Sequence, residues 1–495
     1  MSTSLGQSAA RGALFTLTAT AIKMALQIAS VIVLSRLLTP HDYGLIAIVL
    51  VVIGVGEIFR DFGLTSAAVQ APSLSDGQRD NLFWINTAIG VVLAVLMFGL
   101  SWPLTTLTGE PALLAIVQVL SVTFVFNGLT TQYRAQLMRG LRFRAMAFID
   151  ITAATLALGT AIGAALLGAG YWALVVQQLV NLVTMFVGAI IAGRWIPRFY
   201  SRQHDISTMI RFGWSIVGTG ILTYLGNQID TIMVAARLGT SPLGLYNRAF
   251  QLVMTPLAQV RSPLSNVAIP VLSRVQKDQD RFGKFVISGQ VALGYSLGIP
   301  LMLVAGLAEP VTGIMLGAQW FQAVPIMRLL AITGTLTTLS FVGYWVYISR
   351  GLGKQLFQYS IVSLTIRVCC VVTGSFFGLV GVAAGVAIAP AIAWPISLLW
   401  LSKVTVIPLR ALITGALRII VAVGLVGVTS WGTTTLFDTQ GWASLLAGGL
   451  VGPLPLAALL SIPAFRRDAR NLIGFATSMF KRDRTPRAAR RAETS

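Results

Sequence analysis

The chain has 495 residues, of which 55% are hydrophobic and only 11% are charged, and its mean hydropathy is +0.79. A soluble domain carries about 25% charged residues, so this composition excludes an ordinary soluble protein. The formal net charge is +20, but the basic residues lie between the apolar runs and in the tail. Membrane topology and anionic lipid headgroups explain that placement, so we expect no nucleic-acid partner.

Apolar runs recur along the whole chain, and each is long enough to cross a bilayer as a helix of about 20 residues. We therefore predict an all-α polytopic membrane protein with about 14 transmembrane helices. No run alternates polar and apolar residues as a barrel strand would. The helices are expected near 12–37, 43–69, 82–102, 112–134, 146–167, 171–193, 211–236, 243–271, 286–307, 325–348, 357–377, 380–402, 412–431 and 443–463.

The loops between these runs are alternately basic and nearly free of Lys and Arg. Basic residues gather at 139–144, 194–202, 274–284, 350–354 and 403–410, and in the tail after Pro463. Lys and Arg are enriched in cytoplasmic loops of membrane proteins. The pattern predicts that both termini and every basic loop face the cytoplasm.

The first twelve predicted helices form two copies of one six-helix unit. Gly12, Gln27, Arg36-Leu37 and Thr39 recur 201 residues later, Gly44-Leu45 recurs 200 residues later, and Tyr133, Arg139-Gly140-Leu141 and Gly170 recur 211 residues later. An even number of helices gives both copies the same orientation, and such duplicated proteins usually move a solute between their lobes. We predict an N-lobe at 1–205, a C-lobe at 206–405, two added helices at 406–465 and a basic cytoplasmic tail at 466–495.

Cationic residues inside the predicted helices suggest an anionic substrate. An ionised group at bilayer depth costs about 2.5–3.5 kcal/mol on insertion scales, so it usually faces a partner or a watery cavity. Guanidinium binds phosphate through two parallel donors, which favours Arg for diphosphate recognition. The candidates for diphosphate binding are Lys23, Arg60, Arg248 and Arg261; each of them could instead be a snorkelling or helix-pairing residue.

Acidic and amide residues in the same helices are candidates for other roles. Glu57, Asp61 and Asp230 are candidates for ion coupling or gating, with helix pairing as the alternative. Glu57, Arg60 and Asp61 share one helix face and can pair. Because Asp61 and Arg261 occupy equivalent repeat positions, we hypothesise that they meet. The polar cavity candidates are Gln27, Asn227, Gln228 and Arg367, and Arg328 is a further cation within a helix.

The sequence contains no motif for chemistry on a substrate. It has no phosphate-binding loop of the type found in nucleotide hydrolases, and its two histidines, His41 and His204, are expected in loops. No metal-ligand or nucleophile pattern is present, and the loops on the non-cytoplasmic side are short. We therefore expect neither an enzyme nor a metal site. Pro256, Pro263 and Pro270 are expected to permit kinks in one helix.

Two sets of motifs resemble those of the Wzx/WzxC-type polysaccharide exporters. The first repeat contains Ser35-Arg-Leu-Leu-Thr-Pro-His-Asp-Tyr-Gly-Leu45, Phe59-Arg-Asp-Phe-Gly-Leu64 and Leu82-Phe-Trp-Ile-Asn86. The second contains Asn227-Gln-Ile-Asp-Thr231, Leu243-Gly-Leu-Tyr-Asn-Arg-Ala249 and Pro270-Val-Leu-Ser-Arg274. These exporters belong to the MOP (multidrug/oligosaccharidyl-lipid/polysaccharide) flippase superfamily, which includes the lipid II flippase and the MATE drug exporters. The resemblance covers roughly residues 10–400, and the two added helices are similar to those of the lipid II flippase.

The resemblance implies a substrate and a mechanism. The substrate would be an oligosaccharide unit on undecaprenyl diphosphate, turned by alternating access to the outer leaflet of the bacterial inner membrane for polysaccharide synthesis. Coupling to a sodium or proton gradient is implied, with no cofactor, and polymerase and chain-length proteins are possible partners. Alternatives are a MATE-like cation or drug antiporter, a lipid II-type flippase and a membrane glycosyl-transferring enzyme. The basic tail would bind anionic membrane lipids, with an amphipathic helix possible at 472–480.

Overall fold

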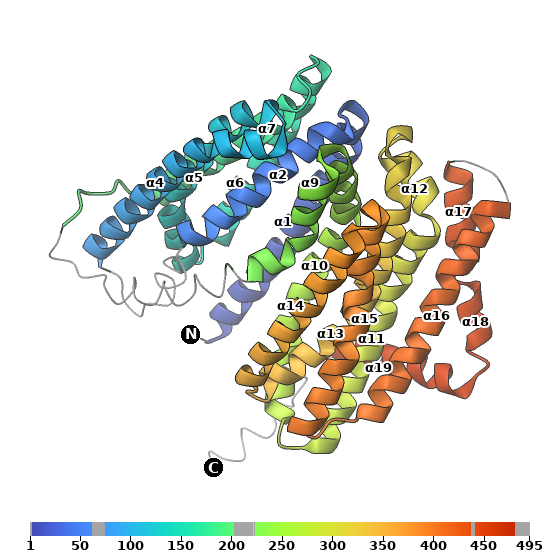
Figure 1. Cartoon of the computed structure of the whole chain (residues 1–495). Helices are drawn as coiled ribbons and strands as arrows, with labels where there is room; N and C mark the ends of the chain where they lie inside the picture. Colours follow the sequence, from blue (N-terminus) through green and yellow to red (C-terminus); the bar gives the residue numbers. More distant parts are fainter. Residues whose placement is uncertain (1, 62–74, 202–220, 222, 437–440, 481–495) are drawn as a thin grey trace, which may run out of the picture. The chain divides into compact units, whose positions relative to one another are not determined.

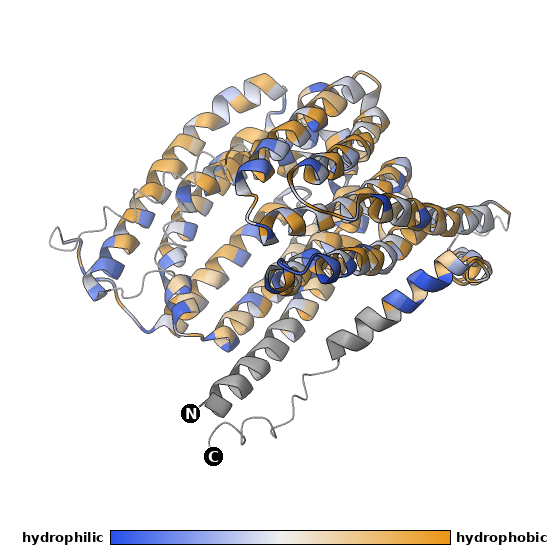
Figure 2. Ribbon diagram, turned by 90° about the horizontal axis from the view of Figure 1, so that it is seen from below, coloured by the Kyte–Doolittle hydropathy of each residue, from blue (hydrophilic) through white to orange (hydrophobic). Residues whose placement is uncertain are grey.

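The computed structural model describes residues 2–61, 75–201, 221, 223–436 and 441–480. All regular secondary structure in these ranges is helical (Figure 1). Twelve helices in the described part are long and apolar enough to cross a membrane by length and composition, and hydrophobic residues make up much of the helical ribbon in Figure 2. The all-α polytopic membrane fold is therefore confirmed.

The predicted number of fourteen spans stays a prediction. The span expected at 211–236 begins among residues outside the described ranges. The span expected at 243–271 lies within α10 (Thr240–Val275), a 36-residue helix that is not among the twelve apolar ones. Its helical structure continues through Pro256, Pro263 and Pro270.

The first compact unit contains residues 1–252, 315–323 and 371–382. Its helices are α1 (Ser2–Leu37), α2 (Pro40–Asp61), α4 (Asp76–Thr108), α5 (Ala112–Arg139), α6 (Phe143–Leu166), α7 (Trp172–Gly193), α9 (Ile229–Leu238) and the start of α10. Helix α5 packs against α4, α7 and α2, while α6 packs against α7 and α1. Helix α4 begins at a reciprocal cap between Ser75 and Gln78 and ends at Gly109, whose φ is +70°. The cap satisfies two backbone donors that the first turn would otherwise leave unpaired.

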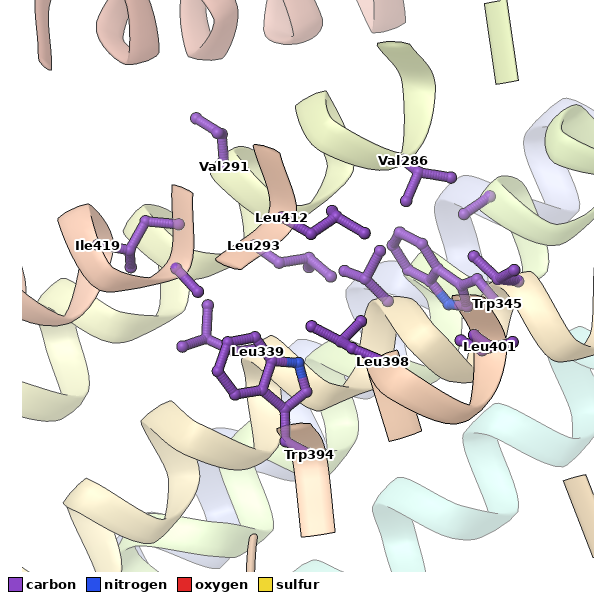
Figure 3. Packing of buried hydrophobic residues seen from close by; sticks show 14 of the residues in the cluster. Val286, Val291, Leu293, Leu339, Trp345, Trp394, Leu398, Leu401, Leu412 and Ile419 are labelled. Carbon is purple, nitrogen blue, oxygen red and sulfur yellow. The ribbon is translucent and has the colours of Figure 1, made fainter. Parts of the chain in front are cut away.

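The second compact unit contains residues 253–314, 324–370 and 383–495. It includes all of α11 (Gln279–Gly306), α13 (Val324–Ser349) and α16 (Leu409–Leu436), and most of α14 (Gly353–Ser375) and α15 (Gly378–Val404). A cluster around Trp345, Trp394, Leu339, Leu398 and Leu412 forms its core (Figure 3). The two units follow spatial contacts and divide α10 after Leu252, so the lobe boundaries expected from the repeat remain predictions.

Helix ends support the internal repeat. Arg36-Leu37 ends α1, and the equivalent Arg237-Leu238 ends α9. Arg139 ends α5, and its equivalent Arg350 directly follows α13. The same residue pairs therefore occupy the same places in both copies.

The structure corrects several predicted boundaries. The helix expected at 443–463 is two short helices, α17 (Trp442–Val451) and α18 (Leu454–Leu459). They are separated at Gly452-Pro453, because proline cannot donate a backbone hydrogen bond to the preceding turn. The structure adds a short helix α12 (Ala308–Met315) and a 3-10 turn η1 (Ala318–Ala323), which the sequence analysis assigned to a loop. His41 lies in the first turn of α2 rather than in a loop.

The C-terminal tail also begins differently. Helix α19 (Pro463–Phe480) includes residues that were expected to be the start of a cytoplasmic tail. The first turns of this helix are hydrophilic in Figure 2, yet Asp468 within them is buried. Helix α19 packs on α11, so this part of the tail belongs to the second unit.

Candidate functional site

Two helix starts from equivalent positions of the repeat meet in the first unit, where α2 contacts α10. A Cβ atom on Gly44 would lie 1.8 Å from the backbone oxygen of Thr240, and one on Gly244 would lie 1.8 Å from that of Pro40. Only glycine permits this approach from both sides. We call this contact the α2–α10 junction, and it fixes the position of the side chains one and two turns further along each helix.

Arg248 lies beside this junction and is 6% exposed. Its guanidinium carbon is 3.3 Å from the centroid of the Tyr43 ring, and its Nη1 donates a 2.6 Å hydrogen bond to Oε1 of Gln251. Its buried Nε has no hydrogen-bond partner within the described residues. The described partners of Arg248 are neutral, so its full positive charge is available to an anion.

Asp230 lies one helix earlier and is 1% exposed. It is in the first turn of α9 and accepts a hydrogen bond from the hydroxyl of Tyr246 on α10. The chain breaks its helical geometry immediately before α9, at Gln228, which bonds to Tyr224 and Thr231. Asp230 therefore lies in the first turn of α9, and a helix N-terminus stabilises a carboxylate.

A separate network joins α2 to α5. Arg60 Nε donates to Glu57 Oε2 at 2.6 Å, and another donor of Arg60 bonds to the Thr131 hydroxyl. The second oxygen of Glu57 accepts from Asn127 Nδ2 at 2.6 Å. The predicted pairing of Glu57 with Arg60 is present, and the pair is neutral overall.

Lys23 belongs to a third group, which links α1 and α5 to α6. Its Nζ is 3.1 Å from Asp150 Oδ2, while Arg134 Nη1 is 2.8 Å from the other oxygen of Asp150. Two cations therefore share one carboxylate. The group carries a net charge of +1 and is half-exposed at Lys23.

Arg261 is the remaining predicted cation and lies in the second unit. Its Nη2 donates a 2.8 Å hydrogen bond to the backbone oxygen of Thr337. Its guanidinium carbon is 4.4 Å from the centroid of the Phe341 ring. As at Arg248, the described partners are neutral. The hypothesised contact with Asp61 is untested, because the side chain of Asp61 lies outside the described residues.

The structure locates the other predicted polar residues on three helices. Gln27 is half-buried in α1, Asn227 is exposed beside the break at Gln228, and Arg367 is half-buried in α14. Arg328, in α13, is 3.9 Å from Glu309 of α12. Of the predicted set, only Glu57 and Arg60 are bonded to each other in the described contacts.

Several polar residues in these networks were not predicted. Asp150 and Arg134 were visible as charged residues inside apolar runs, and this signal could have identified them. Asn127 and Thr131 gave no such signal, because amides and hydroxyls are common in membrane helices. The contact of His41 with Thr240 at the α2–α10 junction was also not predicted: Nδ1 is 2.8 Å from the Thr240 hydroxyl. The Thr240 hydroxyl donates at 2.8 Å to Glu110, so Nδ1 of His41 must be the donor to Thr240.

The contacts sort the predicted cations into two classes. Lys23 and Arg60 are bonded to carboxylates, whereas Arg248 and Arg261 have neutral described partners. Among the described residues, no group of three or more His, Cys, Asp or Glu side chains could hold a metal ion. The arrangement is suited to holding an anion by charge and hydrogen bonds.

Comparison with known proteins identifies relatives over most of the chain. A family model described as polysaccharide biosynthesis protein matches residues 33–325. The succinoglycan biosynthesis transport protein ExoT of Rhizobium meliloti is 28% identical over 358 residues, which are 71% of this chain and 72% of that protein. The lipopolysaccharide biosynthesis protein WzxC of Escherichia coli is 26% identical over 347 residues, 68% of this chain and 69% of that protein.

Two solved structures share the fold. The lipid II flippase MurJ, in an inward closed conformation, matches with a TM-score of 0.68 and 16% identity over 92% of this chain and 99% of MurJ. An inward-facing multidrug resistance MATE transporter of the MOP superfamily matches with a TM-score of 0.60 and 17% identity over 81% of this chain and 99% of that one. At these identities the likeness concerns the fold.

Proposed function

The chain belongs to the polysaccharide biosynthesis protein family, and from this premise we propose that it is a flippase for lipid-linked oligosaccharides. It would turn a polyprenyl-diphosphate-linked repeat unit across the bilayer by alternating access, for the synthesis of an exopolysaccharide, capsule or O-antigen. The observation that carries the proposal is the match, over about 70% of both chains, to a protein named for transport in succinoglycan biosynthesis. The helical fold shared with the lipid II flippase supports it.

We propose Arg248 and Arg261 as two separate candidates for contact with the diphosphate, each within its own compact unit. Among the described residues, the hydrogen-bond partners of each guanidinium are neutral. Arg248 lies over the ring of Tyr43, and Arg261 lies over the ring of Phe341. A charge held in this way keeps unused donors for the oxygens of a diphosphate. Lys23 and Arg60 would contribute positive potential rather than direct contacts, because their nearest described partners are the carboxylates of Asp150 and Glu57.

Asp230 is the residue that we propose for coupling to an ion gradient. Its carboxyl group is buried and accepts from Tyr246, two residues before Arg248 on the same helix. Binding a proton or a sodium ion at Asp230 would change the hydrogen bond to Tyr246 and so bias the position of α10. Glu57 and Asp61 remain further candidates for gating.

We place the protein in the inner membrane of a bacterium with both termini in the cytoplasm. The support is the distribution of basic loops and the many apolar helices. Polymerase and chain-length proteins of the same polysaccharide pathway are the partners we propose, because they would consume the flipped unit.

Flipping in proteoliposomes tests the proposal. A fluorescent polyprenyl-diphosphate oligosaccharide is reconstituted with the protein, and a membrane-impermeant quencher reports the fraction in the outer leaflet. We expect protein-dependent exchange between leaflets that Arg248→Gln slows at least about tenfold, the loss of one or two charge-assisted hydrogen bonds. Export of a cationic dye without any exchange of the lipid would instead indicate the drug antiporter.

A further inference from the structure

A cavity of about 280 Å³ lies between α4 and α5 in the first unit, at the end of α5 that carries the basic loop. It is lined by Arg79, Gln132, Ala135, Gln136, Arg139 and Gly140. Its size is near the lower limit of ligand pockets, about 300 Å³. Two arginines and two glutamines are four of its six lining residues. We call it the α4–α5 pocket.

The polar groups of the α4–α5 pocket are incompletely bonded within the described residues. Gln132 is 1% exposed, and its Oε1 has no hydrogen-bond partner there. The same is true of Oε1 of Gln136 and of Nε of Arg79, which are also buried. A buried polar atom without a partner costs about 1–3 kcal/mol, so such atoms mark a place where a bound group completes the bonding. The side-chain amide can present either its oxygen or its NH₂ group after a half-turn.

The charges around the pocket favour an anion. Arg79 lies 4.3 Å above the Trp195 ring, and its Nη2 is 3.0 Å from Asp76. The Asp76 side chain is 87% exposed, so water screens its charge and the ion pair is weak. The other nearby acid, the buried Asp80, accepts a hydrogen bond from Trp195 Nε1 at 3.1 Å. Arg139 adds a second positive charge at the mouth.

The second repeat has non-ionic residues at three of the four equivalent polar positions. At the offset of 211, Gln132 and Gln136 correspond to Gly343 and the fully buried Tyr347. Ser75 caps α4 and Asp278 caps α11, and Arg79 and Phe282 each lie four residues after their cap. The two residues are therefore equivalent, and Phe282 is also fully buried. Arg350, the equivalent of Arg139, stacks 4.0 Å above Phe282 and donates to the backbone oxygen of Gln276. The two arginines and two glutamines of the first copy are therefore not repeated as a set in the second copy.

The mouth of the pocket adjoins an apolar rim. Gly140 lines the pocket, and the next residue, Leu141, is 68% exposed. Phe143 and Met138 on either side are also exposed. A lipid headgroup in the pocket would have its hydrocarbon chain beside these apolar side chains.

From these contacts we infer that the α4–α5 pocket binds the phosphate or diphosphate headgroup of a lipid. Arg79 and Arg139 supply the charge, and Gln132 and Gln136 bond to the remaining phosphate oxygens. This inference rests on the proposed function only for the identity of the lipid. That lipid would be the polyprenyl diphosphate carrier, bound at the cytoplasmic entrance. A phospholipid headgroup or free pyrophosphate has the same chemistry.

Calorimetric titration of the purified full-length protein tests the inference. The probes are a short-chain prenyl diphosphate, the matching prenol, phosphatidylglycerol and inorganic pyrophosphate. The variants are Arg79→Gln, which removes charge, and Gln136→Tyr, which fills the hollow with the residue of the second repeat. The control is Arg144→Gln, which removes one exposed charge from the same basic loop without touching the pocket.

We expect wild type and Arg144→Gln to bind the prenyl diphosphate alike, and Arg79→Gln and Gln136→Tyr to bind it at least about tenfold more weakly. A similar loss of binding in all three variants would mean that the diphosphate is attracted by general positive charge. Unchanged binding by Gln136→Tyr would mean that the diphosphate binds elsewhere. Either result would overturn the inference that the α4–α5 pocket is the binding site. Tighter binding of the prenyl diphosphate than of phosphatidylglycerol or pyrophosphate identifies the carrier. Diphosphate binding that persists while proteoliposomes show no flipping would contradict the proposed function and leave the pocket intact.

Discussion

At the scale of single residues, the turn after α5 shows how the two repeats solve one problem differently. In the second copy Gly351, the second residue after α13, takes the left-handed conformation, with φ of +70°. In the first copy Gly140 has φ of −75°, and Leu141 takes the left-handed position with φ of +51°. A side chain in that conformation costs about 1–2 kcal/mol, which glycine avoids. The first copy therefore carries backbone strain next to the α4–α5 pocket.

Replacing Leu141 by glycine should stabilise the protein. The relief of strain exceeds the extra entropy that glycine gives the unfolded chain, so we expect a gain of up to about 1 kcal/mol. Thermal unfolding of the detergent-solubilised protein measures it. Gly140→Ala is the control and should be nearly neutral, since its φ is negative and the nearest atom to a Cβ there is 3.4 Å away. A destabilised Leu141→Gly would mean that the leucine side chain contributes more than its backbone costs.

Arg248 and Arg60 offer a second comparison between residues. Arg248 is buried on neutral partners, so its charge is costly to bury, whereas Arg60 is bonded to Glu57. We expect Arg248→Met to leave the melting temperature unchanged or raised while it abolishes flipping. Arg60→Met should lower stability by about 3 kcal/mol, because it leaves the carboxylate of Glu57 without its cation. A large loss of stability in Arg248→Met would assign Arg248 a structural role instead.

At the scale of elements, the α2–α10 junction depends on two glycines. A methyl group at Gly44 or Gly244 would lie 1.8 Å from a backbone oxygen, so the helices would have to separate. We expect Gly44→Ala and Gly244→Ala each to lower stability by about 1–3 kcal/mol, the usual cost of overpacking. Gly99→Ala in α4 is the control, because nothing lies within 4 Å of a Cβ at that position. Equal unfolding temperatures for all three variants would contradict the close contact.

Helix α19 is held to the second unit by a two-pronged ion pair. Arg418 of α16 bonds to both oxygens of the buried Asp468, at 2.9 and 3.0 Å, and Tyr295 of α11 contacts the same carboxylate at 3.4 Å. Asp468→Asn should cost about 3 kcal/mol and make α19 sensitive to limited proteolysis, because one charge is left unpaired. The double variant Arg418→Met/Asp468→Leu should recover most of that stability. Failure to recover would mean that the contact with Tyr295, rather than the ion pair, holds the helix.

The sequence predicted helices far better than the contacts between them. Runs of apolar residues located the end of the first helix at Leu37, and they placed the end of the span expected at 211–236 two residues before Leu238, where α9 ends, because such signals are local. The division of the last span at Gly452-Pro453 and the docking of α19 through Asp468 were missed. Asp468 lies among Arg466, Arg467 and Arg470, so the sequence alone predicts that it is exposed to solvent. Its pairing with Arg418 of another helix becomes visible only in the structure.

The candidate site was predictable only in part, for a related reason. A charge inside an apolar run is visible in the sequence, which is how Arg248, Arg261, Lys23 and Arg60 were found. Whether such a charge is neutralised depends on a partner on another helix, as Asp150 is for Lys23. Sequence separations of about a hundred residues carry no information on that pairing.

At the scale of the whole molecule, the two copies of the repeat share helix ends but differ in side chains at equivalent positions. Equivalent positions place Arg237 and Arg36 at helix ends in both copies, yet Arg79 and Phe282 differ completely in character. When residues at equivalent positions of a duplicated transporter differ, the two halves can present different side chains to a substrate. The chain belongs to the polysaccharide biosynthesis protein family and shares its helical fold with the lipid II flippase.

The most direct measurement compares two cargoes in the same proteoliposomes: a fluorescent polyprenyl-diphosphate oligosaccharide and a fluorescent organic cation. The imposed proton or sodium gradient is varied in both assays, with Asp230→Asn as the uncoupled variant. We predict gradient-dependent flipping of the lipid, loss of that dependence in Asp230→Asn, and no movement of the cation. Movement of the cation with an immobile lipid would contradict the flippase and assign the same fold to drug export.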